Sequence, residues 1–131
     1  MNKIAASITK IQSSDVINIV SFDVAGQRMK MMALELDEGL QVDSKVMIGV
    51  KATNIVLSKE QIETISISNQ LEVKVVSVNM GTLLCSVRFA LEDEEWESLI
   101  SRESALKIGV EADKMAVALI KSSELSIVEI L

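Results

Sequence analysis

Hydrophobic and polar residues alternate along two stretches of the chain, one at the N-terminus and one in the middle. Ile4, Ala6 and Ile8 alternate with small or polar residues in the first stretch, and Leu71 and Val73 do so in the second. A period of two residues is typical of β-strands, because successive side chains of a strand point to opposite faces. Both stretches are therefore predicted to be strands with one buried face.

Shorter apolar runs follow each of these stretches, and turn residues such as Ser, Asp, Asn and Gly separate them at 13–15 and 79–81. A helical turn is predicted at 103–107 and ends at Gly109, since glycine favours the left-handed conformation that closes helices. The further predicted strands are 16–22, 28–35, 45–51 and 55–57 in the first half, and 83–89, 96–102, 114–121 and 125–130 in the second.

The two halves repeat one pattern. Residues match at a spacing of 67 positions at first, and at a spacing of 70 after an insertion of three residues. A repeat of this length indicates one structural unit present twice. The matched pairs include Asn2 with Asn69, Phe22 with Phe89, Gly39 with Gly109, Asp43 with Asp113, and Lys51 with Lys121.

Five short strands in each repeat favour a small, partly open barrel of the OB type. We expect a first repeat at 1–57, a linker at 58–68 with a helical turn over 59–63, and a second repeat at 69–131. A unit of about 60 residues is marginally stable alone. The two barrels are therefore expected to pack on each other and on other subunits.

Composition narrows what such barrels can do. The 131 residues include 13 Lys and Arg, 19 Asp and Glu, no His and no Tyr, and the net charge is −6. An acidic chain with few aromatic residues disfavours anionic membranes and nucleic acids, including the single strands that OB folds bind. Without His, the Ser-His and Cys-His nucleophiles are excluded. We expect a binding protein with no catalytic activity, cofactor or metal cation.

Several side chains that could suggest chemistry have ordinary structural interpretations. The single cysteine, Cys85, lies in a predicted strand and is expected to be a small buried hydrophobe. Met29 and Met31 are expected to fill the core or a subunit contact, and the acidic residues around Trp96 to form an exposed turn. The single cysteine, the absence of a signal peptide and the short apolar runs favour a cytoplasmic protein outside membranes.

Several segments, in order, are similar to those of one family. Residues 66–71, Ser-Ile-Ser-Asn-Gln-Leu, resemble its leading segment Ser-Ala-Arg-Asn-Gln-Leu, and residues 100–104 resemble Ile-Thr-x-x-Ser. Residues 106–109 and 118–123 resemble its Leu-Gly-Leu-Lys and Ala-Leu-Ile-Lys-Ala/Ser-Thr/Ser segments, and the first repeat keeps Asn2 and 48–53. The chain thus resembles a tandem double-repeat member of the Mop family, the molbindins, within the TOBE group.

This resemblance implies an all-β fold of two tandem five-stranded OB-like barrels of the Mop/TOBE type, each with a short helical turn. It also implies a cytoplasmic protein that binds molybdate or tungstate for storage, buffering or homeostasis. Double-repeat members are homotrimers with sites at subunit interfaces. Their oxyanion is held by backbone N–H groups, hydroxyls and a lysine, and no metal cation takes part.

The resemblance assigns candidate ligands by position. Molybdate is a dianion whose oxygen atoms only accept hydrogen bonds at neutral pH, so a site made of donors suits it. The candidates in the second repeat are Ser66, Ser68, Ser101, Ser104, Lys121 and Ser122, and those in the first repeat are Lys51, Ala52 through its backbone N–H, and Thr53.

The chain departs from the family pattern in two places. Ser68 runs directly into Asn69, so the arginine of the family's leading segment is absent. In the first repeat, Met31 and Leu34 are expected at the positions of Ser101 and Ser104. Fewer sites than in a symmetric member are therefore expected, and the alternative function is a sensor or protein-interaction module that has lost most anion sites.

Each candidate ligand also has an ordinary structural interpretation. Lys51 and Lys121 can end strands at the surface, as most lysines do. Ser101 and Ser104 can cap the predicted helical turn, a role compatible with anion binding. Ser66 and Ser68 can be plain linker residues.

Overall fold

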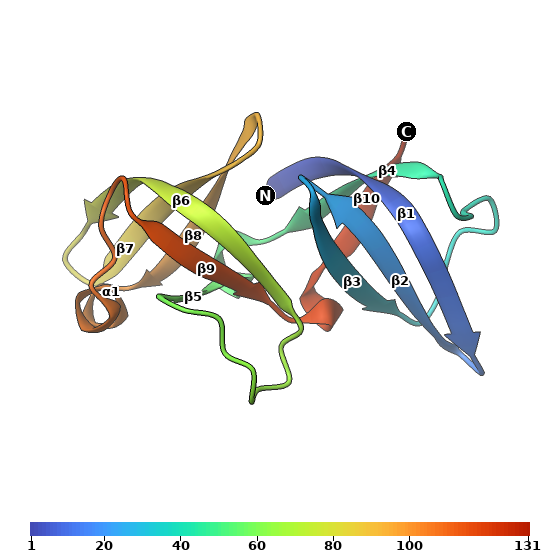
Figure 1. The fold of residues 1–131 in the computed structure, drawn as a ribbon, viewed down its shortest axis with the longest axis horizontal. Helices are drawn as coiled ribbons and strands as arrows, with labels where there is room; N and C mark the ends of the chain where they lie inside the picture. The colour runs from blue at the N-terminus through green and yellow to red at the C-terminus, as the bar shows by residue number, and fades with distance from the viewer.

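The computed structural model describes residues 1–131 and contains ten strands in two five-stranded antiparallel sheets (Figure 1). Each sheet curls into a partly open barrel, which confirms the predicted all-β fold of two OB-like barrels. The strands are β1 (Asn2–Ser14), β2 (Ile17–Val24), β3 (Gln27–Ala33), β4 (Lys45–Val50), β5 (Val56–Ser58), β6 (Asn69–Met80), β7 (Leu84–Leu91), β8 (Glu94–Ser101), β9 (Met115–Ile120) and β10 (Ser126–Ile130).

Three short helical elements complete the fold. The 3-10 turns η1 (Ala52–Asn54) and η2 (Ser122–Glu124) occupy equivalent positions in the two repeats. The only α-helix, α1 (Arg102–Ile108), ends at Gly109 in the left-handed conformation, as predicted. No helix in the structure has both the length and the apolar character needed to cross a membrane.

The last short strand of each half lies in the barrel of the other half. The first barrel has the strand order β10-β4-β1-β2-β3, and the second has β5-β9-β6-β7-β8. Leu57 of β5 pairs with Ala118 of β9, and Ile127 of β10 pairs with Ile48 of β4. The predicted boundaries at 57 and 69 thus describe the sequence repeat, whereas each barrel combines strands from both sides of the linker.

The two barrels share one hydrophobic core. A single cluster of 26 buried residues includes Phe22 and Met29 of the first barrel and Phe89 and Trp96 of the second. These residues are equivalent in the two barrels, because Phe22 pairs with Met29 and Phe89 pairs with Trp96 across their strand ladders. The shared core and the exchanged strands join the repeats into one folding unit.

The repeated asparagines join the barrels through their side chains. Asn69 donates to the Lys30 carbonyl at 2.8 Å and accepts from the Lys30 N–H at 2.7 Å. Asn2 makes the same pair of bonds with the backbone of Glu97, both at 2.8 Å. Each side-chain amide therefore pairs both the N–H and the carbonyl of one residue in an edge strand of the other barrel. The sequence marked these asparagines as equivalent but indicated no role for them.

Asn69→Ala is expected to lower the free energy of unfolding by about 1–3 kcal/mol, because it leaves backbone groups of Lys30 without partners. Asn69 is 1% exposed, so water cannot easily replace its amide. Asn2 is only half-buried, and Asn2→Ala should cost less. Urea unfolding followed by circular dichroism measures both variants. Equal losses, or no loss for Asn69→Ala, would contradict this role.

The strand registers correct the alignment of the two repeats. Val20 pairs with Met31 and Val87 pairs with Ser98, so the counterpart of Met31 is Ser98 and not Ser101. The spacing of 67 therefore persists to the end of the third strand, and the insertion falls where α1 forms. The first repeat has an irregular segment over 34–44 in place of that helix.

The predicted helical turn at 59–63 is wrong, since the linker contains only bends and turns. The side-chain amide of Gln70 accepts from the Ile62 N–H and donates to the Ile62 carbonyl, both at 2.8 Å. It also donates to the Ile67 carbonyl at 2.9 Å. The Gln70 side chain therefore pairs the N–H and carbonyl groups of the linker that would otherwise form the hydrogen bonds of a helix.

Candidate functional site

The two lysine motifs adopt the same local structure at the ends of β4 and β9. Lys51 and Lys121 have extended backbones, with φ and ψ of −72° and 143° for Lys51 and −61° and 139° for Lys121, and each immediately precedes a 3-10 turn. The Lys51 carbonyl accepts from the Asn54 N–H, and the Lys121 carbonyl accepts from the Glu124 N–H, both at 2.9 Å. Both lysines are exposed. Their side chains are therefore free to reach an anion in solvent.

The turns η1 and η2 meet at the junction between the barrels. The Asn54 side-chain amide donates to a carboxylate oxygen of Glu124 at 2.9 Å, which links the two turns directly. The structure therefore brings the candidates of the first repeat, Lys51, Ala52 and Thr53, into the same region as Lys121 and Ser122 of the second. Glu124 adds a negative charge to this group of donors. Sequence analysis identified neither Asn54 nor Glu124, although they occupy equivalent positions in the two repeats.

Ser68 belongs to the same region. Asn69, the first residue of β6, pairs with Ile120, the last residue of β9. The antiparallel register therefore places Ser68 beside Lys121, just beyond the end of this ladder. Ser66 precedes Ser68 by two residues in a bend of the linker, and both serines are exposed. Lys121, Ser122 and Ser68 are thus neighbours on the surface of the junction.

Ser101 and Ser104 lie elsewhere. The Ser101 hydroxyl accepts from the Ser104 N–H at 3.1 Å and donates to the Ser104 hydroxyl at 2.9 Å, which caps the N-terminus of α1. Ser101 pairs with Leu84, at the start of β7. Figure 1 shows α1 at the outer end of the second barrel, away from the first barrel. One chain therefore does not bring these serines together with Lys121, and their role as ligands remains a prediction.

The remaining reactive side chains are structural. Cys85 is completely buried, and burial raises the pKa of its thiol, an effect that the nearby Arg102 guanidinium partly offsets. Met29 and Met31 are also buried, whereas Met32 is exposed. The side chain of Trp96 lies in the core, and the acidic residues at 93–95 are exposed, as predicted. Glu97, predicted to be exposed with them, is half-buried and accepts from the Ser86 hydroxyl. No group of three or more His, Cys, Asp or Glu side chains is arranged to hold a metal ion.

Two comparisons with known proteins match this chain. The TOBE domain family matches residues 65–127. The structure also superposes on a crystal form, grown from polyethylene glycol, of the cytoplasmic molybdate-binding protein ModG with molybdate bound. The TM-score is 0.87 at 22% sequence identity, and the match covers 95% of this chain and 93% of that one.

A search of curated protein sequences found no match. At 22% identity the likeness to ModG establishes the fold. Both comparisons nevertheless agree, since the matched domain is the second repeat and the superposed fold contains both repeats. Residues 65–127 therefore match the TOBE domain family, and the chain as a whole shares its two-barrel fold with ModG.

Proposed function

We propose that this chain binds molybdate at the junction of its two barrels, through the donors around η1 and η2. The observation that carries the proposal is the repeated lysine turn, which places Lys51 and Lys121 in the same geometry on two linked elements. The superposition on a molybdate-bound protein over nearly the whole of both chains supports it.

The chemistry of the junction suits a tetrahedral dianion. Lys51 and Lys121 supply ammonium groups, Thr53 and Ser122 supply hydroxyls, and Ala52 supplies a backbone N–H. Hydrogen bonds from charged donors to an anion are the strongest of these, at roughly 1.5–3 kcal/mol each. Tungstate has the same charge and shape, so we propose that the protein stores or buffers either anion in the cytoplasm.

We further propose that the sites are completed between subunits of a homotrimer. Ser101 and Ser104 lie at the outer end of the second barrel, and Lys121 lies at the junction, so one chain cannot join them around one anion. A second subunit can bring its Ser101 and Ser104 to the junction of the first. Light scattering with and without molybdate tests the assembly, and a monomer that binds molybdate would contradict it.

Lys121→Ala is expected to weaken molybdate binding about ten- to hundred-fold, because it removes one charge-assisted hydrogen bond. Titration calorimetry of the folded protein with molybdate measures the change, and tungstate and sulfate test selectivity. Lys10→Ala is the matched control, since Lys10 is an exposed lysine of β1 outside the candidate ligands and its loss changes the net charge equally. If both variants bind like the original protein, Lys121 is not a ligand.

The second candidate function is a sensor or protein-interaction module that has lost most anion sites. Two observations favour it: the arginine of the family's leading segment is absent before Asn69, and the Glu124 carboxylate lies among the donors. This alternative predicts no heat on titration with molybdate, tungstate or sulfate. It also predicts no molybdenum in protein purified from molybdate-supplemented cells, as measured by elemental mass spectrometry.

A further inference from the structure

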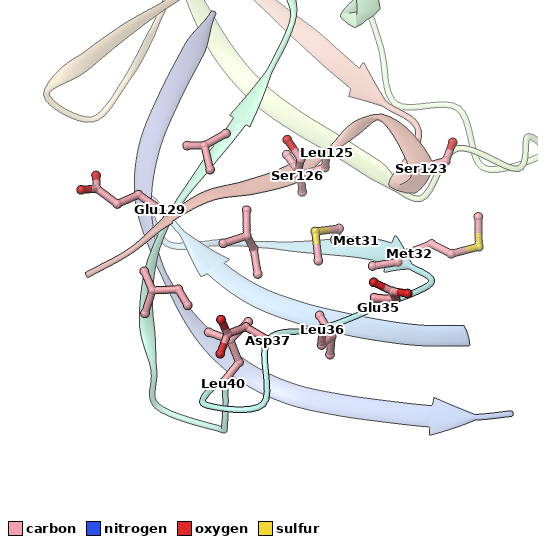
Figure 2. Close-up of a pocket in the computed structure, with 14 residues that line it drawn as sticks. Met31, Met32, Glu35, Leu36, Asp37, Leu40, Ser123, Leu125, Ser126 and Glu129 are labelled. Carbon is pink, nitrogen blue, oxygen red and sulfur yellow. The ribbon is translucent and has the colours of Figure 1, made fainter. Parts of the chain in front are cut away.

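An apolar groove opens on the first barrel, between the end of β3, the 35–40 segment and β10. Its volume is about 600 Å³, and nine of its fourteen lining residues are hydrophobic. Figure 2 shows Met31, Leu36 and Leu40 along the β3 side and Leu125 on the η2–β10 side. None of the candidate oxyanion ligands lines it. This size and lining are typical of a binding groove.

The first barrel has no counterpart of α1 beside this groove. In the second barrel α1 follows the third strand and buries Ala105 to 1% exposure. In the first barrel the segment over 34–44 is three residues shorter than its counterpart and irregular, and it leaves Leu36 and Leu40 only half-buried. The corresponding groove of the second barrel, between the end of α1 and β5, is smaller, at about 340 Å³.

One wall of the groove is the edge strand β10. β10 forms hydrogen bonds with β4 only, so its other edge carries backbone groups that no strand pairs. Val128 and Ile130 on this strand are 39% and 49% exposed. Natural edge strands are often blocked by lysine, by proline or by covering segments. β10 contains neither lysine nor proline, and its own protective features are Glu129 and the bulge between Ile127 and Glu129. Such an edge can accept a further strand.

The charges around the groove all have one sign. Glu35, Asp37 and Glu129 are among its lining residues, and none of the fourteen is Lys or Arg. Figure 2 shows the three carboxylates at separate points around the apolar side chains. A partner that buries apolar side chains here therefore gains from positive charges beside them, and an acidic partner is repelled.

We propose that this groove and the free edge of β10 bind an extended segment of a partner protein in which apolar residues alternate with lysine or arginine. The segment adds to β10 as a strand, a known mode of peptide recognition. Its apolar side chains contact Met31, Leu36 and Ile127, and its cationic side chains face Glu35 and Glu129. This binding does not depend on the oxyanion site.

The probe is a fluorescein-labelled peptide of sequence Ile-Lys-Ile-Lys-Val-Lys, titrated with the full chain and followed by fluorescence anisotropy. We expect saturable binding that weakens with added salt, and no binding of Ile-Glu-Ile-Glu-Val-Glu. The double variant Glu35→Gln/Glu129→Gln should bind the basic peptide about five-fold more weakly, since exposed ion pairs contribute little each. The matched control is Glu63→Gln/Glu111→Gln, which removes two exposed carboxylates outside the groove and should leave the affinity unchanged.

A backbone variant tests the added strand. Val128 lies at the register shift between Ile127 and Glu129 and has no Cα partner in β4, so Val128→Pro is the substitution in β10 that disturbs this ladder least. We expect it to abolish peptide binding while the urea midpoint changes little. Equal weakening by both double variants, or equal binding of Ser-Lys-Ser-Lys-Ser-Lys, would show charge attraction alone and overturn the proposal. Self-association that Val128→Pro abolishes, without peptide binding, would assign the edge to a second copy of this chain and also overturn it.

Discussion

Residues 1–68 and 69–131, produced as separate chains, are expected to lack a stable monomeric fold. The first fragment keeps β1–β4 but loses β10, the edge strand of its barrel, and the second loses β5. Each fragment also exposes its half of the shared core. A unit of about 60 residues has little stability to spare, so losing a strand and half of the core should unfold it.

The same exchange predicts that the two fragments assemble when mixed. Each carries the strand that the other lacks, so an equimolar mixture should regain the β-sheet circular dichroism signal and elute as a 1:1 complex. Size-exclusion chromatography with light scattering measures the stoichiometry. A fragment of 69–131 that assembles as a homodimer is consistent with the exchange, because its own β10 can serve a second copy. A fragment that unfolds cooperatively as a monomer would contradict it.

Trp96→Ala is expected to lower the free energy of unfolding by about 3–5 kcal/mol, the range for truncating a buried aromatic residue. The Trp96 side chain is completely buried. Its indole N–H also donates to the Lys3 carbonyl at 3.1 Å, which ties the second barrel to the first strand of the chain. Urea unfolding followed by circular dichroism measures the loss.

Two further variants separate packing from the hydrogen bond. Trp96→Phe keeps much of the apolar volume but removes the donor to Lys3, so it should cost less than Trp96→Ala. Met29 occupies the equivalent position in the first barrel, and Met29→Ala removes a smaller buried side chain without any hydrogen bond. If Trp96→Ala costs no more than about 1 kcal/mol, the core must collapse around the vacancy more readily than such cores usually do.

Strand positions were predictable because they depend on local patterns. The alternation over Ile4, Ala6 and Ile8 lies in β1, and that over Leu71 and Val73 lies in β6. The helical turn before Gly109 was predictable too, since a left-handed residue closes it. Prediction failed where the local pattern competes with a side chain farther along the chain. The Gln70 amide donates to the Ile62 carbonyl, and the linker forms no helix.

The candidate site was only partly predictable. Sequence analysis identified Lys51 and Lys121 as equivalent, and the structure places both in the same turn geometry. It could not show that Asn54 and Glu124 link these turns, because that contact joins residues 70 positions apart. It also grouped Ser101 with Lys121 as ligands of one repeat, whereas the folded chain places them at different ends of the second barrel.

The sequence by itself determined that this protein is a pair of small β-barrels, since the alternation of apolar residues and the internal repeat can both be recognised without knowing which strands pair. Only the tertiary structure decided which copy supplies each fifth strand. The two repeats offer equivalent edges, β4 and β9, and the short strand β10 pairs with β4 while β5 pairs with β9. Because both edges present the same kind of unpaired backbone groups, the local pattern does not distinguish the two pairings, and the fold of the whole chain does.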